Sequence, residues 1–194
     1  NLRYIHGIRT SMGGTARPWD TNILWDALVH DAYLFPAIAG RQPRRVLAVG
    51  QAYLDPKLED VAFVTFDFGD GLLGHVYVSW YALEKVRQIT VVGEKSILAY
   101  DDLAKPSLNL YARRYEQSEQ KDPMGHPRWY WRDDGKRAIE ALTVEPLKVE
   151  CQHFVDCVVG GHRPRTDGVK GLDAVYLLEA CQRSLETEGW VVLE

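Results

Sequence analysis

The feature that most constrains the fold is a glycine-rich break between two alternating segments. Residues 60–68 and 72–82 alternate apolar and polar side chains, and only Gly69-Asp70-Gly71 separates the two segments. An Asp-Gly pair accepts the positive φ angles of a tight hairpin turn, so the segments are predicted to be antiparallel neighbours. We therefore expect a meander sheet at the core of the domain.

Other segments with strand-like alternation should extend this sheet, and they cover residues 2–12, 45–54, 86–100 and 190–193. Helical spacing predicts a first helix from Asn22, a plausible N-cap, to Gly40, and Pro36 should bend or shorten it. Two more helices are predicted over 147–159 and 169–187. This order indicates an α+β fold, in which helices pack on one face of a largely antiparallel open sheet.

Each of the two closing helices carries an apolar stripe that is expected to face the core. In the first helix the stripe comprises Cys151, Phe154, Val155 and Val158. In the second helix it comprises Leu172, Val175, Leu178 and Leu185. Thr166 or Asp167 is expected to cap the second helix.

The segment 72–82 is predicted to present two different faces. Its apolar face, which should pack on helices, consists of Leu72, Val76, Val78 and Trp80. Its other face is half polar and half aromatic, and it consists of His75, Tyr77, Ser79 and Tyr81. That composition suits a protein interface better than water or a core, so we expect a homo-oligomer that forms through this face.

Residues 113–143 show no clean period and are expected to form a long, irregular excursion, such as a lid or a dimer arm. The segment contains the aromatic cluster Trp129-Tyr130-Trp131. Trp129 is a candidate for stacking against a sugar ring. Burial of the cluster against a partner subunit is the favoured alternative.

Composition excludes several classes of partner. The 194 residues include 23 basic and 27 acidic side chains that are mixed along the chain, so no basic surface for nucleic acid or anionic membrane is expected. No apolar run approaches the roughly 20 residues that span a bilayer. The length fits one globular domain over residues 1–194, and a small or neutral ligand fits better than a polyanion.

The cysteines and histidines indicate neither disulfides nor a metal site. Cys151, Cys157 and Cys181 are odd in number and lack CxxC spacing, which favours reduced thiols and a cytoplasmic protein. Five histidines outside the first helix are scattered without metal-ligand spacing, and they are His6, His75, His126, His153 and His162. No metal is therefore predicted.

The strongest chemical constellation is Asp26-x-x-x-His30, because this spacing places both side chains on one face of a helix, about one turn apart. A carboxylate that contacts an imidazole fixes its tautomer and raises its basicity, as a general base requires. The residues alone leave a capping or surface pair open as the alternative. Arg9 and Arg17, near the first loop, are candidates for contact with a polyol or a nucleotide-sugar phosphate.

Several stretches, in the same order along the chain, resemble the Gfo/Idh/MocA family of NAD(P)-dependent oxidoreductases. The first runs from Asn22 through Trp25-Asp26 and His30-Asp31 to Gly40 and Pro43. The second comprises Glu145-Pro146-Leu147, Glu150, His153-Phe154, Gly160-Gly161, Arg163-Pro164, Thr166-Asp167-Gly168, Gly171-Leu172 and Leu178-Glu179-Ala180. Ser79-Trp80 and the segment from Val92 to Asp101 are similar to the family's sheet, whereas residues 101–143 match loosely.

The resemblance implies a two-domain enzyme. An N-terminal Rossmann domain, missing from this chain, would bind NAD or NADP, and this domain would supply an open sheet, substrate contacts and the oligomer interface. Asp26 and His30 occupy the family's catalytic positions, with His30 as the base that accepts the proton of a substrate hydroxyl. Asp31 beside them is a further candidate substrate contact. The expected substrate is a sugar, inositol or nucleotide-sugar, and hydride passes to or from nicotinamide.

Two departures from the family pattern indicate that this domain alone is inactive. No GxGxxG leads from a strand into a helix, and the family's Glu-Lys-Pro motif is missing, because Val86 follows Glu84-Lys85. The chain begins at Asn1, which suggests that an upstream part is missing. The rival interpretation is a non-catalytic binding or dimerisation module. A free-standing hydrolase or isomerase would need a nucleophile or metal site that the sequence does not offer.

Overall fold

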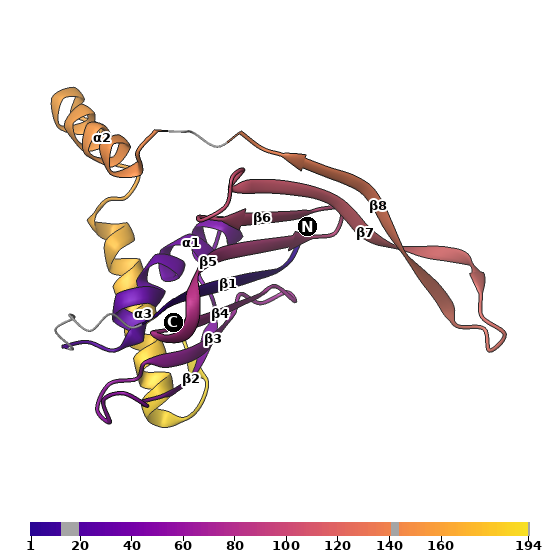
Figure 1. Cartoon of the computed structure of the whole chain (residues 1–194), viewed down its shortest axis with the longest axis horizontal. Helices are drawn as coiled ribbons and strands as arrows, with labels where there is room; N and C mark the ends of the chain where they lie inside the picture. Colours follow the sequence, from indigo (N-terminus) through magenta and orange to yellow (C-terminus); the bar gives the residue numbers. More distant parts are fainter. Residues whose placement is uncertain (13–19, 141–143, 194) are drawn as a thin grey trace.

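The computed structural model describes residues 1–12, 20–140 and 144–193. These residues form a nine-stranded sheet in the order β8-β7-β6-β5-β1-β4-β3-β2-β9 (Figure 1). Its strands are β1 (Leu2–Met12), β2 (Arg45–Gln51), β3 (Val61–Asp67), β4 (Leu73–Ser79), β5 (Tyr81–Gly93), β6 (Ile97–Asp101), β7 (Leu108–Lys121), β8 (Pro127–Ala138) and β9 (Val191–Val192). The helical elements are the π-helix η1 (Leu24–Leu28) and the α-helices α1 (Val29–Ala39), α2 (Pro146–Gly160) and α3 (Gly168–Thr187). The fold is α+β, as predicted.

The predicted hairpin is confirmed. β3 and β4 are antiparallel, and Val64 pairs with Val76. Gly69, Asp70 and Gly71 between them have φ angles of 77°, 53° and 79°. Positive φ at three successive positions is tolerable because two of them are glycines, which carry no Cβ.

The position of β1 departs from a simple meander. β1 lies between β4 and β5, parallel to β4 and antiparallel to β5. Ile5 pairs with Gly74 in the first ladder and with Val91 in the second. The remaining ladders are antiparallel. Because β1 and β4 are parallel, their carboxyl ends meet at the same edge of the sheet.

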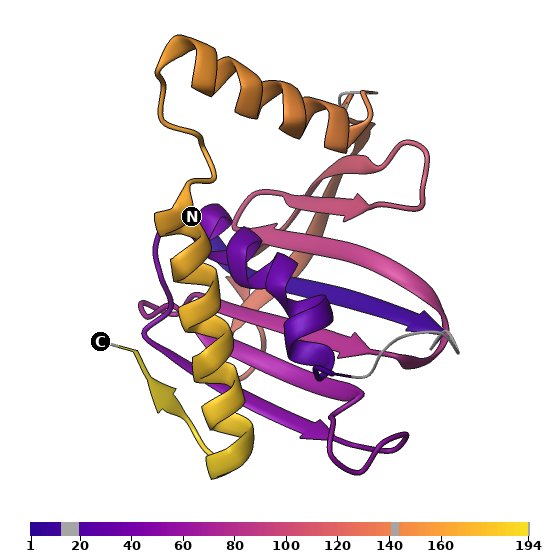
Figure 2. The same ribbon diagram turned by 90° about the vertical axis from the view of Figure 1, so that its left-hand side faces the viewer.

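Helices α1 and α3 cover one face of the sheet, as Figure 2 shows. The core lies in this layer, where Phe35 of α1 packs on the strands, and Gly74 of β4 leaves room for its ring. The predicted apolar face of 72–82 is confirmed, since Leu72, Val76, Val78 and Trp80 are all buried. The sheet residues on the opposite face have no helix over them in the described part of the chain.

The predicted packing of the closing helices is only partly correct. Along α2, Phe154, Val155 and Val158 are 63%, 51% and 68% exposed, and the helix projects away from the sheet (Figure 1). Along α3, Leu178 is buried but Leu172 and Val175 are exposed. The buried stripe of α3 instead comprises Ala174, Leu177, Leu178, Ala180, Cys181 and Ser184. Periodicity reveals an apolar stripe but not whether the surface that covers it belongs to the same chain.

Two predicted strand boundaries are wrong. The segment 86–100 is not one strand, because a turn closed by the Gly93 N–H and the Ser96 carbonyl at 2.9 Å separates β5 from β6. The segment 72–82 bends at Trp80, so Tyr81 begins β5 and pairs with Met12 of β1. A bend interrupts alternation, and the side chains on either side of it no longer share one face.

Residues 113–138 are not irregular as expected. They belong to β7 and β8, which form a long antiparallel hairpin that projects beyond the sheet (Figure 1). Ion pairs cross between the strands at 2.8 Å from Arg113 to Asp133 and at 2.6 Å from Arg114 to Asp134. A ribbon held by ionic pairs lacks apolar alternation, which is why the sequence pattern resembles a loop. Residues 141–143 lie outside the described residues.

No helix in the described ranges is both long enough and apolar enough to cross a membrane. Cys151, Cys157 and Cys181 are free thiols, and burial raises the pKa of Cys181 to about 12.

Candidate functional site

A small cavity of about 140 Å³ lies where the carboxyl ends of β1 and β4 meet the start of the helical layer. Four segments line it, which are the end of β1, the η1–α1 segment, the end of β4 and the first half of β5. The lining residues are Arg9, Thr10, Ser11, Ile23, Asp26, Ala27, His30, Ser79, Trp80, Lys85 and Arg87. The parallel pairing of β1 and β4 brings these distant segments together.

Asp26 is held at the wall of this cavity by the sheet. The indole Nε1 of Trp80 donates a hydrogen bond to Asp26 Oδ2 at 2.8 Å. Trp80 is 4% exposed, so its ring is fixed by the core. Asp26 therefore presents a carboxylate whose position depends on a residue 54 positions away in the sequence.

His30 lines the same cavity, but its contact with Asp26 differs from the sequence prediction. In the described part of the chain no hydrogen bond joins the two side chains, although Asp26 lies near enough to act on the charge of His30. Asp26 belongs to a π-helix, where backbone pairing runs from i to i+5, so a step of four residues completes less than one turn. The two groups face one cavity without the direct contact that i, i+4 spacing in an α-helix would allow.

The surroundings of His30 favour its neutral form. Partial burial lowers the pKa of His30 below its usual value, and the positive charges of Arg9 and Arg87 lower it further. Asp31 and Asp26 oppose this shift without cancelling it. A neutral imidazole near neutral pH can accept a proton.

Arg9 and Asp31, two predicted substrate contacts, are bound to each other. Arg9 Nε donates to Asp31 Oδ2 at 3.0 Å and Nη2 donates to Oδ1 at 3.3 Å. The side chain of Asp31 is 1% exposed and that of Arg9 is 19% exposed. The two-point pair fixes the plane of the guanidinium, so Arg9 reaches the cavity while Asp31 lies beneath it.

Trp129, another predicted substrate contact, is not at this cavity. Trp129 pairs with Gln117 in the outer part of the β7–β8 hairpin, and β7, β6 and β5 lie between its strand and β1. Arg17 lies outside the described residues.

Lys85 also lines the cavity, although in the sequence it stands out only as part of a departure from the Glu-Lys-Pro motif. The hydroxyl of Thr10, which is 6% exposed, donates to the Glu84 carbonyl at 2.9 Å and accepts from the Val86 N–H at 3.2 Å. Thr10 thus fixes the backbone on both sides of Lys85. The sequence did not reveal Lys85 as a site residue, because the pairing of β1 with β5 was not predictable from local pattern.

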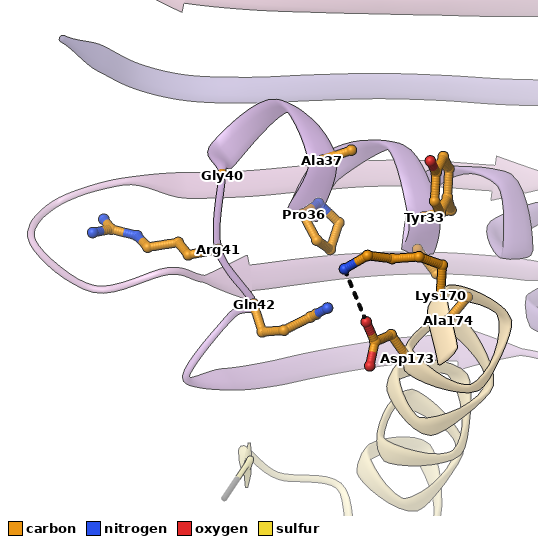
Figure 3. Close-up of a pocket in the computed structure, with 10 residues that line it drawn as sticks. Tyr33, Pro36, Ala37, Gly40, Arg41, Gln42, Lys170, Asp173 and Ala174 are labelled. Atoms are coloured by element: carbon orange, nitrogen blue, oxygen red, sulfur yellow. Dashed lines mark hydrogen bonds and ion pairs between the residues drawn. The ribbon is translucent and has the colours of Figure 1, made fainter. Parts of the chain in front are cut away.

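A larger cavity of about 330 Å³ lies between α1 and α3, and Figure 3 shows its lining. Tyr33 and Pro36 of α1 face Lys170 and Asp173 of α3, whose charged ends are 3.4 Å apart. No imidazole lines this cavity, and its lysine and carboxylate are paired with each other. We therefore take the smaller cavity around His30 as the candidate site.

Within the described ranges, no group of three or more His, Cys, Asp or Glu side chains is arranged to hold a metal ion.

Residues 5–99, which run from within β1 through the first helical segment and β2 to β5 into β6, match the family described as GFO/IDH/MocA C-terminal domain. The chain contains a Gfo/Idh/MocA C-terminal domain. No curated protein matches this Gfo/Idh/MocA sequence.

Solved structures share the fold of this Gfo/Idh/MocA domain at low sequence identity. UDP-N-acetylglucosamine 3-dehydrogenase GnnA from Acidithiobacillus ferrooxidans matches with a TM-score of 0.77 and 20% identity over 96% of this chain and 54% of its own. The WlbA dehydrogenase from Bordetella pertussis, in complex with NADH and UDP-GlcNAcA, matches with a TM-score of 0.70 and 18% identity over 100% of this chain and 55% of its own. A levoglucosan dehydrogenase in complex with NADH and L-sorbose matches with a TM-score of 0.76 and 15% identity over 100% of this chain and 58% of its own. The chain thus spans little more than half the length of these structures.

Proposed function

We propose that this domain is the substrate side of an NAD(P)-dependent oxidoreductase that transfers hydride between nicotinamide and a hydroxyl of a sugar, inositol or nucleotide-sugar. The observation that carries the proposal is the cavity in which the imidazole of His30 and the carboxylate of Asp26 face a common space. The Gfo/Idh/MocA family match supports it, and so does the shared fold with dehydrogenases of sugars and nucleotide-sugars.

In the proposed reaction His30 is the general base. One of its ring nitrogens accepts the proton of the substrate hydroxyl while the carbon that bears this hydroxyl becomes a carbonyl carbon. Bound nicotinamide would take the hydride that leaves this carbon. Arg9 and Arg87 assist because their charges lower the pKa of His30 and keep its imidazole neutral before the reaction.

Asp26 has the complementary role of positioning the substrate. Its carboxylate is an acceptor for a hydroxyl next to the reacting carbon, and the hydrogen bond from Trp80 holds it in place. Arg9 supplies a donor for a polar oxygen of the substrate, and the buried Asp31 holds Arg9 in its orientation. In this assignment Asp31 is a positioning residue, and Lys85 adds a cation at the cavity wall.

We assign the binding of NAD or NADP mainly to an N-terminal dinucleotide-binding domain that these 194 residues do not include. The GxGxxG of this sequence, Gly69 to Gly74, joins strand β3 to strand β4 and does not open a helix, as a dinucleotide-binding turn would. The cavity around His30 holds about 140 Å³, which suits a reacting group better than a dinucleotide. The domain alone is therefore expected to lack dehydrogenase activity. Free thiols fit a reducing, cytoplasmic location.

The open face of the sheet is proposed to pair with a second copy of the chain. His6 stacks on His75 with ring centroids 5.7 Å apart, and Phe63 stacks on Tyr77 at 4.9 Å. Phe63 is 47% exposed because no helix of the described residues covers it, so an apolar surface faces water in the single chain. Of the predicted interface residues, His75 and Tyr77 lie on this face, whereas Ser79 is buried and Tyr81 belongs to β5 beyond the bend.

Two measurements test the proposed function. Calorimetric titration with NADH and NADPH is run on this chain and on the protein extended upstream to its native start. Binding by the extended protein alone, together with NAD(P)-dependent oxidation of a sugar or polyol in a substrate screen, is the expected result. Absence of cofactor binding by both would instead favour a non-catalytic binding or dimerisation module.

A further inference from the structure

The β7–β8 hairpin extends past the sheet as a two-stranded ribbon (Figure 1). All twelve residues of β8 are exposed. A two-stranded hairpin in water is marginally stable without a third layer or strand. Something outside the described chain is therefore expected to support it.

The two faces of this ribbon differ in chemistry. On one face Tyr115 lies opposite Trp131 and Gln117 lies opposite Trp129, and we call this the aromatic face. On the other face Glu116 lies opposite Tyr130, and Arg114 lies opposite Arg132. Register alone thus separates the aromatic cluster, with Trp129 and Trp131 on one side and Tyr130 on the other.

The polar groups of the second face find their hydrogen-bond and ion-pair partners within the ribbon. Tyr130 donates its hydroxyl proton to Glu116 at 2.6 Å, and Arg114 contacts both Glu116 and Asp134 at 2.6 Å. Arg132 donates to Asp134 at 2.9 Å. A face of paired charges and hydrogen bonds is stable in water and needs no covering surface.

The aromatic face has no such support. Tyr115, Trp129 and Trp131 are 66%, 62% and 46% exposed. Tyr115 and Trp131 contact each other edge to face at 4.9 Å, which leaves most of both rings in water. Exposed aromatic side chains gathered on one surface are typical of the energetic centre of a protein interface.

The aromatic face continues the open face of the sheet. Tyr111 of β7 pairs with Ile97 of β6, on the side of the sheet opposite the helices. Arg113 lies over the ring of Tyr111 at 4.9 Å, so alternation is preserved along β7 as the strand leaves the sheet. Tyr115, two residues further, lies on the same side. The register shift next to Tyr111 places the extra residue on β8, where Gly135 has a φ angle of 106°.

We propose that the β7–β8 hairpin is an arm whose aromatic face grips a second copy of this chain. The inference rests on the proposed pairing of open sheet faces and extends that interface beyond the sheet edge. On the continuous face Arg113 is bound to Asp133 and Arg45 is bound to Asp67, both at 2.8 Å, and the ammonium of Lys136 lies 5.2 Å from the centre of the Tyr111 ring. A two-fold interface brings a surface against itself, and ion pairs within each copy reduce the repulsion between the two copies.

The test compares two neighbouring residues of the arm in the full-length protein. Trp131→Ser removes a ring from the aromatic face, and Tyr130→Ser removes one from the opposite face, where the exposed fraction is nearly equal at 47% against 46%. Sedimentation velocity over a range of concentrations gives the dissociation constant of self-association. Trp131→Ser should raise it roughly tenfold or more, and Tyr130→Ser should change it by less than about threefold.

A second measurement guards against unfolding of the ribbon. Hydrogen exchange should protect the amides of residues 115–117 at assembling concentrations in the wild-type protein, and dilution to monomer should remove this protection. The proposal is overturned if the wild type is monomeric at all concentrations, if both serine variants weaken assembly equally, or if neither does. Turnover measured on the same samples separates this outcome from failure of the proposed chemistry, because an active enzyme with unchanged assembly contradicts the arm alone.

Discussion

Trp80 and Asp26 join the sheet to the helical layer, because the indole N–H of Trp80 donates to Asp26 Oδ2 at 2.8 Å. Trp80 follows β4 at the bend before β5, and Asp26 lies in the π-helix above it. The carboxylate that faces the candidate site is therefore oriented by a core residue. This relationship makes the geometry of the site sensitive to a side chain that is almost fully buried.

Substitution of Trp80 should separate positioning from packing. Trp80→Phe keeps an aromatic ring but removes the donor to Asp26, and in the full-length enzyme kcat should fall roughly tenfold. Trp80→Ala also removes the packed ring and should lower the free energy of unfolding by about 3 to 5 kcal/mol. Urea denaturation and steady-state kinetics check the two values. Normal kcat in Trp80→Phe would show that the hydrogen bond does not position Asp26 for the reaction.

Removal of the proposed base should affect chemistry and not cofactor affinity. His30→Ala in the full-length enzyme is expected to reduce turnover by about 100-fold or more, because no other imidazole lines the cavity. The dissociation constant for NADH or NADPH, measured by calorimetry, should remain nearly unchanged. His162→Ala, at an exposed histidine between α2 and α3, is the matched control. A His30→Ala variant with normal turnover would remove His30 from the mechanism.

The pH dependence should follow the lowered pKa of His30. A base acts in its neutral form, so kcat/KM for hydroxyl oxidation should be full near neutral pH and should fall as pH drops through a pKa below 6.5. Arg87→Gln removes a positive charge that lowers this pKa, so the acidic limb should move to higher pH. Arg128→Gln, in the β7–β8 hairpin, should leave the limb in place. A limb that does not move in Arg87→Gln would contradict the assignment of the limb to His30.

The open face should tolerate charge poorly. Tyr77→Glu places a carboxylate beside the stacked ring of Phe63, and it should weaken self-association roughly tenfold or more. Leu103→Glu adds the same charge at an exposed turn between β6 and β7 and should have little effect. Light scattering coupled to size-exclusion chromatography measures both. Unchanged assembly in Tyr77→Glu would place the interface elsewhere.

Two glycines should respond to alanine with opposite signs. A Cβ at Gly74 would lie 2.8 Å from a ring carbon of Phe35, so Gly74→Ala should lower the free energy of unfolding by about 1 to 3 kcal/mol. A Cβ at Gly171 in α3 meets nothing within 4 Å, so Gly171→Ala should raise it by about 0.5 to 1 kcal/mol. Denaturant unfolding compares the two variants with the wild type. Equal stability in Gly74→Ala would mean that the ring of Phe35 can move aside.

The fold was predictable where structure depends on neighbouring residues. Gly69, Asp70 and Gly71 specified the β3–β4 turn, and the alternation that led to Trp80 identified the buried face of β4. The parallel pairing of β1 with β4 was not predictable, because Ile5 meets Gly74 across a long sequence separation that no local pattern encodes. The same limitation hid Lys85, which reaches the site only because β5 pairs with β1.

The sequence predicted which residues form the candidate site better than it predicted the contacts between them. Asp26 and His30 do line one cavity. The prediction that they touch required a regular α-helix, whereas the π-helix over Leu24–Leu28 changes the direction of one side chain relative to the other. Asp31 was predicted to contact the substrate, but its side chain is buried and is bound at two points by Arg9.

Because the β7–β8 hairpin lies at the edge of the sheet, selection can act on subunit assembly and on the chemistry of the site separately. β8 pairs with β7 at the end of the sheet, far along the strand order from the strands that line the cavity. Insertions or deletions of paired residues in this hairpin can therefore alter how subunits recognise one another while the register of β1, β4 and β5 is retained. Quaternary structure can diverge among descendants of such a domain at a different rate from its chemistry.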